Sequence, residues 1–111
     1  MIRTVLLALS IVTVRHPYPA DRPAPVAEAI IRDVWPAHLA DAAISVAFCE
    51  SRMRGNARNG RFRGLFQIGP REWAAHRPRP DADIYDRRDN AQAAYSYWLT
   101  TRDWRRWSCR P

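Results

Sequence analysis

The 111-residue chain contains no lysine, only two cysteines and only three glutamates. Its basic side chains are therefore all arginines, and they give the chain a formal net charge of +7 at pH 7. A GC-rich coding sequence accounts for the missing lysine, so this absence indicates little about function. The positive charge still favours an anionic partner, such as nucleic acid, anionic lipid head groups or the polyanions of a bacterial envelope.

The sequence also lacks a hydrophobic run of the ~20 residues that a membrane-spanning helix needs. Its most apolar stretch, Thr4–Val14, is shorter than that and follows the positive charge of Arg3. This pattern is typical of an export leader, and we assign residues 1–15 to a signal peptide. An uncleaved signal-anchor stays open, because no clean small-x-small cleavage site stands out. A buried N-terminal helix of a cytosolic protein is the third alternative.

Four prolines rigidify residues 16–25, which we interpret as a linker that leads into a single folded domain, residues 26–111. A domain this small has little stability to spare. A bridge between Cys49 and Cys109 would stabilise it by about 4 kcal/mol in the chain-entropy model. The leader indicates an oxidising compartment, which favours the bridge over two free thiols. We therefore expect a protein that is secreted or associated with the cell envelope.

No internal repeat, low-complexity tract or sustained strand alternation is present, so we predict a mainly α domain. Helical spacing and flanking prolines predict helices over residues 24–35, 38–50, 70–75 and 88–100. Asn59-Gly60 predicts a turn, with at most a short hairpin, in the loop between the second and third helices. We expect Asp89 to cap the last helix and the apolar stripe of that helix to dock on residues 38–50.

Glu50 falls in line with Leu39, Ala43 and Val46 on the apolar face of the second predicted helix. Burying a carboxyl group on such a face is costly and favours its protonated form. A carboxylic acid that stays protonated and faces a cleft can give its proton to a glycosidic oxygen as the bond breaks. On spacing alone, the alternative is an ordinary solvated glutamate at a helix end.

The Glu50-Ser51 pair is followed by an Asn- and Gly-rich loop over residues 56–60 and then by Gly64-Leu65-Phe66-Gln67-Ile68. This order and spacing resembles the lytic transglycosylase and goose-type lysozyme superfamily. In that family a Glu-Ser pair ends a core helix, and a Gly-Leu-Met-Gln segment crosses the floor of the cleft. The stretch from Asn90 to Cys109 is similar to the short single-domain versions found in actinobacteria and their phages. The resemblance covers residues 38–109 and implies a small lysozyme-like domain.

Three features depart from the family pattern. Phe66 stands at the Met position, and Arg54-Gly55 stands where larger members carry Asn-Pro. The Ala-Tyr-Asn motif, which supplies a second catalytic-site tyrosine in the larger enzymes, is missing. Tyr95 is our candidate to replace that tyrosine, with Tyr97 as the alternative.

The resemblance implies cleavage of the β-1,4 bond between N-acetylmuramic acid and N-acetylglucosamine in peptidoglycan. Glu50 would act first as acid and then as base, leaving a 1,6-anhydro end without water entering. Ser51 and Gln67 would bind the substrate by hydrogen bonds, Phe66 by stacking on a sugar face, and Tyr95 would complete the site. Each has a structural alternative: Ser51 capping its own helix, Gln67 binding the loop, and Phe66 packing in the core.

Two other functions stay open. A lysozyme-like hydrolase on the same fold would need a second carboxylate, for which Asp86 and Asp89 are the candidates. A non-catalytic basic protein would bind wall polymer or nucleic acid through the arginines of residues 52–63.

We expect peptidoglycan glycan strands as the partner, with anionic wall polymers as a further one, and no nucleic acid. We also expect a monomer without a cofactor, and the three histidines are too scattered along the chain for a metal site. A phage-encoded origin is consistent with the resemblance.

Overall fold

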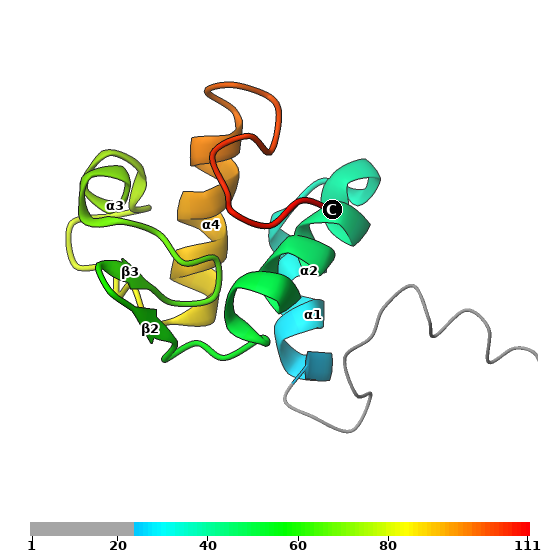
Figure 1. Ribbon diagram of the computed structural model, residues 1–111, viewed down its shortest axis with the longest axis horizontal. Helices are drawn as coiled ribbons and strands as arrows, with labels where there is room; N and C mark the ends of the chain where they lie inside the picture. Colours follow the sequence, from blue (N-terminus) through cyan, green and yellow to red (C-terminus); the bar gives the residue numbers. More distant parts are fainter. Residues whose placement is uncertain (1–23) are drawn as a thin grey trace, which may run out of the picture.

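The computed structural model describes residues 24–111, so the predicted leader and most of the predicted linker lie outside the described residues. This part of the chain folds into four helices and a two-stranded hairpin (Figure 1). Its elements are α1 (Ala24–Val34), α2 (Ala37–Ser51), β2 (Arg58–Asn59), β3 (Phe62–Arg63), α3 (Pro70–His76) and α4 (Arg87–Trp98). The predicted mainly α domain with a short hairpin is confirmed.

Prolines mark several helix boundaries. Pro36 separates α1 from α2, because the residue before a proline avoids the helical conformation. Pro70 occupies the first turn of α3, where its missing N–H leaves no hydrogen bond unmade. Pro25 lies in the first turn of α1, which begins at Ala24, so residues 24 and 25 of the predicted linker are helical.

The N-cap of α4 is Asp86, and the prediction of Asp89 was wrong. The carboxylate of Asp86 accepts a hydrogen bond from the backbone N–H of Asp89 at 2.9 Å. Asp89 is instead buried in the first turn, where the guanidinium of Arg79 donates to both of its oxygens at 2.8 and 3.0 Å. Burial alone would raise the pKa of Asp89, but the hydrogen bonds from the Asp83 amide and from Arg79 hold it below its usual value. Two acids three residues apart both suit a helix start, and only the tertiary contact with Arg79 separates their roles.

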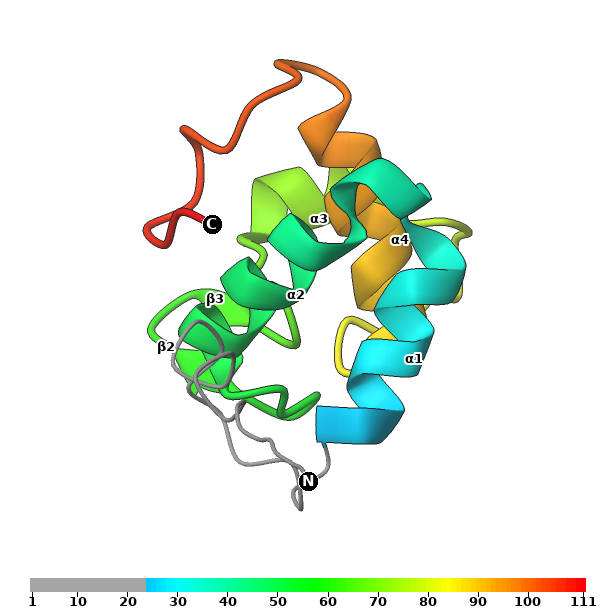
Figure 2. The same cartoon turned by 90° about the vertical axis from the view of Figure 1, so that its right-hand side faces the viewer.

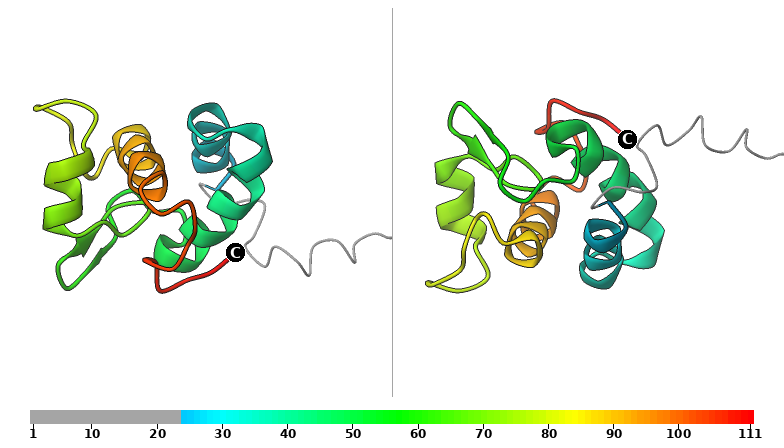
Figure 3. Two further views of the ribbon diagram at one scale, coloured as in Figure 1. Left: turned by 90° about the horizontal axis from the view of Figure 1, so that it is seen from above. Right: turned by 90° about the horizontal axis from the view of Figure 1, so that it is seen from below.

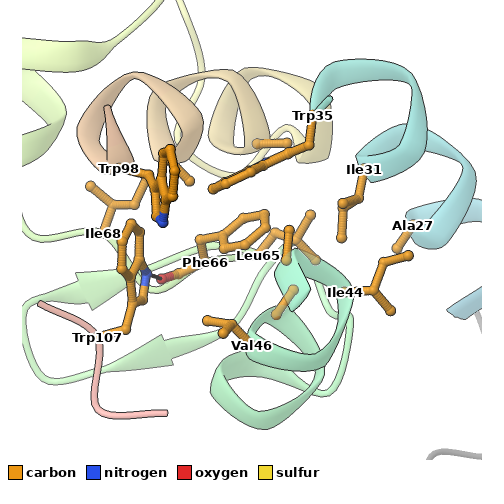
Figure 4. Close-up of a cluster of buried hydrophobic side chains, with 14 of the residues drawn as sticks. Ala27, Ile31, Trp35, Ile44, Val46, Leu65, Phe66, Ile68, Trp98 and Trp107 are labelled. Atoms are coloured by element: carbon orange, nitrogen blue, oxygen red, sulfur yellow. Dashed lines mark hydrogen bonds between the residues drawn. The ribbon is translucent and has the colours of Figure 1, made fainter. Parts of the chain in front are cut away.

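Helix α4 is the centre of the packing. It lies between α3 on one side and α1 on the other, and Figure 3 shows it end-on between them. We expected the apolar stripe of α4 to dock on α2, and this was wrong, because α4 packs chiefly on α1 and α3. Residues 64–68, which we call the central segment, are entirely buried, and Figure 4 shows Leu65 and Phe66 in the space between α2 and α4. The ring of Phe66 stacks on Trp35 with 5.5 Å between ring centroids.

Asn90 of α4 holds the central segment in place. Its side-chain oxygen accepts from the backbone N–H of Phe66 at 2.7 Å, and its nitrogen donates to the carbonyl of Ile84 at 2.9 Å. Gly64 lets the chain turn beside this amide, with a φ of 82° that favours glycine. A Cβ at Gly64 would overlap both the Asn90 side chain and the Ile84 carbonyl. One buried amide and one glycine thus fix the start of the central segment.

The hairpin projects beside the central segment. Arg58 pairs with Arg63 and Asn59 with Phe62, in antiparallel register. Gly60 begins the two-residue loop with a φ of 62°, which places the turn where Asn59-Gly60 predicted it.

Residues 99–111, which we call the tail, form no helix or strand and cross back from the end of α4 towards α2 (Figures 1 and 2). The predicted disulfide between Cys49 and Cys109 is confirmed and joins the tail to α2, with 6.0 Å between the two Cα atoms. Trp104 stacks on Trp35, with 5.3 Å between ring centroids. Trp107 donates its indole N–H to the carbonyl of Phe66 at 3.0 Å (Figure 4). The tail is therefore attached both to α2 and to the central segment.

Among the helices described for residues 24–111, none has the length and apolarity to cross a membrane.

Candidate active site

Glu50 lies in the last turn of α2, where the apolar stripe of that helix reaches the surface. Ala43 and Val46 in the same stripe are buried, whereas Glu50 is only half-buried. Its Oε2 accepts a hydrogen bond from the backbone N–H of Cys109 at 3.1 Å. Its other oxygen has no hydrogen-bond partner among the described residues and is available to contact a substrate. We expected Glu50 to be buried. It instead lies half-buried at the surface, and the Cys109 amide holds one of its oxygens.

Glu50 lines a cleft of about 270 Å³. The lining comes from the end of α2, the hairpin, the central segment, α3, α4 and the tail. Its residues are Glu50, Asn59, Arg61, Phe62, Gln67, Ile68, Gly69, Glu72, Tyr97, Arg106, Trp107 and Ser108. Aromatic rings interspersed with amides, hydroxyls and charges suit a polar ligand that also has apolar faces, such as a sugar.

Gln67 lies in this cleft with 8% of its surface exposed. Its side-chain nitrogen donates to the carbonyls of Gly64 at 3.0 Å and Ala57 at 3.2 Å. Its side-chain oxygen has no protein partner in the described part of the chain. The nitrogen therefore holds the loop, and the oxygen is left to accept from a ligand hydroxyl or N–H group.

Three other predicted substrate-binding residues do not line the cleft. Ser51 is buried and donates its hydroxyl to the carbonyl of Ala47 at 3.0 Å, so it caps its own helix. Phe66 has no exposed surface and packs in the core, so its ring cannot stack on a sugar. Tyr95 packs against Trp35, with 5.1 Å between ring centroids. Of the two tyrosines considered, it is Tyr97 that lines the cleft.

The tail contributes residues that the sequence interpretation did not place in the site: Arg106, Trp107 and Ser108. A signal for them was present, because a bridge from Cys109 to Cys49 brings the preceding residues close to Glu50. Trp107 both packs in the core and lines the cleft.

Glu72 is the second carboxylate of the cleft, and the sequence interpretation missed it. The predicted candidates, Asp86 and Asp89, line a different groove together with Arg79 and Gln92. Glu72 lies in the first turn of α3, which directly follows the central segment. Nothing in the local sequence indicates that Glu72 lines the same cleft as Glu50.

His76 lies beside the cleft, behind Tyr97. Its Nδ1 is 2.8 Å from the hydroxyl of Ser96, and its ring centroid is 5.4 Å from that of Tyr97. Burial lowers the pKa of His76, an effect that Glu72 opposes and Arg106 reinforces. Within residues 24–111 the structure contains no group of three or more His, Cys, Asp or Glu side chains that could hold a metal ion.

Comparison with protein families matches residues 35–109 to the lysozyme-like domain, and the chain belongs to this family. The matched range runs from Trp35 to Cys109 and so contains Glu50, the central segment and the tail. Neither the curated proteins nor the solved structures contain a match to the chain.

Family membership confirms the small lysozyme-like fold predicted from the motifs. It also supports an enzyme that cleaves glycosidic bonds and acts on peptidoglycan. The Cys49–Cys109 disulfide and a wall-acting domain fit a location outside the cytoplasm.

Proposed function

We propose that the protein is a peptidoglycan lytic transglycosylase with Glu50 as its catalytic residue. The observation that carries this proposal is the position of Glu50: it lines the cleft, and the Cys109 amide holds one of its two oxygens. The other oxygen is left for proton transfer. Gln67 lines the same cleft, and its side-chain oxygen, which has no protein partner among the described residues, can orient the sugar.

In the first step, Glu50 donates its proton to the oxygen between N-acetylmuramic acid and N-acetylglucosamine. The C1–O bond breaks as positive charge develops at C1 of the muramic sugar, and the substrate's own acetamido group stabilises this charge. In the second step, the Glu50 carboxylate takes the proton of the C6 hydroxyl. The C6 oxygen then closes on C1 and forms the 1,6-anhydro end. One carboxylate serves both steps, and its proton is restored at the end.

The test is mass spectrometry of muropeptides released from purified peptidoglycan by residues 24–111 with the disulfide formed. The wild type should release anhydro ends. Glu50→Gln should lower the release rate by at least about 10²-fold, the lower range for a general acid-base group, while the melting temperature stays close to that of the wild type. Full activity of Glu50→Gln would contradict the assignment of Glu50.

A lysozyme-like hydrolase is the second candidate, and Glu72 favours it, because a second carboxylate in the cleft could activate a water molecule. Glu72→Gln separates the two reactions. Anhydro ends that persist in Glu72→Gln support the transglycosylase, whereas reducing ends that disappear in this variant support the hydrolase. No release at all from folded, oxidised protein would instead favour a non-catalytic wall-binding protein.

We further propose that residues 1–15 direct export and that residues 16–23 link the leader to the domain. N-terminal sequencing of the protein recovered from the culture medium and from the membrane fraction distinguishes a cleaved signal peptide from a signal-anchor.

A further inference from the structure

Two arginines line the cleft from different parts of the chain, Arg61 from the hairpin loop and Arg106 from the tail. Each rests on an aromatic ring that also lines the cleft. The guanidinium carbon of Arg61 is 5.3 Å from the ring centroid of Phe62, and that of Arg106 is 5.3 Å from the ring centroid of Tyr97. A guanidinium held by its flat face keeps its N–H edge free for a ligand.

Neither of these arginines is paired with a carboxylate in the described part of the chain. Four other arginines there do form ion pairs with Asp or Glu, namely Arg32, Arg79, Arg88 and Arg105. Arg61 and Arg106 are both exposed. The cleft therefore contains two positioned cations whose hydrogen-bonding edges are available to an anion.

On the basis of the function proposed above, we propose that Arg61 and Arg106 recognise free carboxylates on the peptide stems of peptidoglycan. They would make the cleft selective for glycan that carries such stems. An anion that reaches these arginines while the glycan contacts Glu50 has to be attached close to the scissile bond. The stem on the lactyl group of N-acetylmuramic acid meets this requirement, and its carboxylates match the two parallel N–H groups of a guanidinium.

Binding is measured by calorimetric titration of the Glu50→Gln protein, which prevents turnover. The ligands are a glycan tetrasaccharide with free-carboxylate stems, the same glycan with amidated stems, the same glycan with an amidated lactyl carboxyl group in place of each stem, and a poly(glycerol phosphate) chain. We expect the free-carboxylate ligand to bind about tenfold more tightly than the amidated or stem-free glycan, because the loss of one charge-assisted hydrogen bond weakens binding by about this factor. Arg61→Gln and Arg106→Gln should each reduce this preference, and the double variant should abolish it.

Arg58→Gln and Arg102→Gln are the matched controls. Each removes one exposed positive charge, from the hairpin and from the tail respectively, and neither residue lines the cleft. Both should keep the preference for free-carboxylate stems. An equal loss in these controls would mean that overall charge, and not the two positioned arginines, attracts the ligand.

Equal affinity for the stem-bearing and stem-free glycans would overturn the inference while leaving the proposed cleavage intact. Preferential binding of poly(glycerol phosphate) that depends on Arg61 and Arg106 would overturn it in favour of a phosphate polymer. Failure of the proposed function is seen separately, as the absence of glycan cleavage by the protein with Glu50 intact. A stem preference that persists in such an inactive protein would support the recognition of stems by a binding module.

Discussion

The central segment and the tail both line the cleft, but they are held in place by different means. The central segment is buried, and the side chain of Asn90 binds the backbone of Phe66. The tail has no helix or strand and is fixed by the Cys49–Cys109 disulfide and the indole N–H of Trp107. One side of the cleft thus depends on tight packing and the other on a covalent tether. We therefore expect substitutions in the central segment and in the tail to change stability and hydrogen exchange in different ways.

The largest expected effect comes from disturbing the packed side with Gly64→Ala. The added methyl group would overlap the Asn90 side chain and the Ile84 carbonyl, at a backbone φ of 82° that alanine adopts poorly. We expect a loss of more than about 4 kcal/mol in the free energy of unfolding, measured by urea denaturation. Gly60→Ala is the matched control, because Gly60 also has positive φ but has open space around it. It should cost only about 1 kcal/mol, and an equal cost at both sites would argue against the packing at Gly64.

The tethered side is broken by the double variant Cys49→Ser/Cys109→Ser. Removing this bridge between residues 60 positions apart should cost about 4 kcal/mol in the chain-entropy model. Because the tail has little regular structure, hydrogen exchange should show its amides losing protection well before the amide of Phe66. Activity should fall as well, since the amide that binds Glu50 moves with the tail. Simultaneous loss of protection in both regions would mean that the tail and the central segment are not held in place independently.

The smallest expected effect concerns His76, the last residue of α3. It lies beside the part of the cleft that Tyr97 and Arg106 line. Burial lowers its pKa in the folded protein below the ordinary value of 6.5. Between the two pKa values the unfolded chain binds more protons, so stability is complete above about pH 6.5 and declines as the pH falls through this window. Urea denaturation at a series of pH values should show this decline, and His76→Gln should remove it. A decline of the same size in His76→Gln would assign it to another group.

Most of the fold could be predicted from the sequence because its signals are local. Pro36 and Pro70 mark helix boundaries, and Asn59-Gly60 marks the turn of the hairpin. The errors concern tertiary contacts. The docking of α4 was wrong because a short apolar segment can fill the space between two helices, which periodicity does not reveal. The cap of α4 was wrong because the contact with Arg79 decides the role of Asp89.

The motifs carried part of the information about the candidate site, and the Cys49–Cys109 bridge carried a further part that the sequence interpretation did not use. Glu50 and Gln67 line the cleft as expected, whereas Ser51 and Phe66 from the same motifs are buried. A motif specifies which residues occur together, but it does not specify which side of the backbone each one faces. Glu72 was missed for the same reason, since the direction of the first turn of α3 depends on how that helix packs.

The hydrogen bond between the Cys109 amide and Glu50 has a consequence for the order of events during synthesis. The two residues are 59 positions apart, so Glu50 leaves the ribosome long before the amide that anchors it. Translation of the tail and its return to α2 must precede completion of the cleft. A nascent chain that stops short of residue 109 therefore carries the Glu50 carboxylate without its anchor. Under the proposed function, we expect full cleavage activity only after Cys109 has been made.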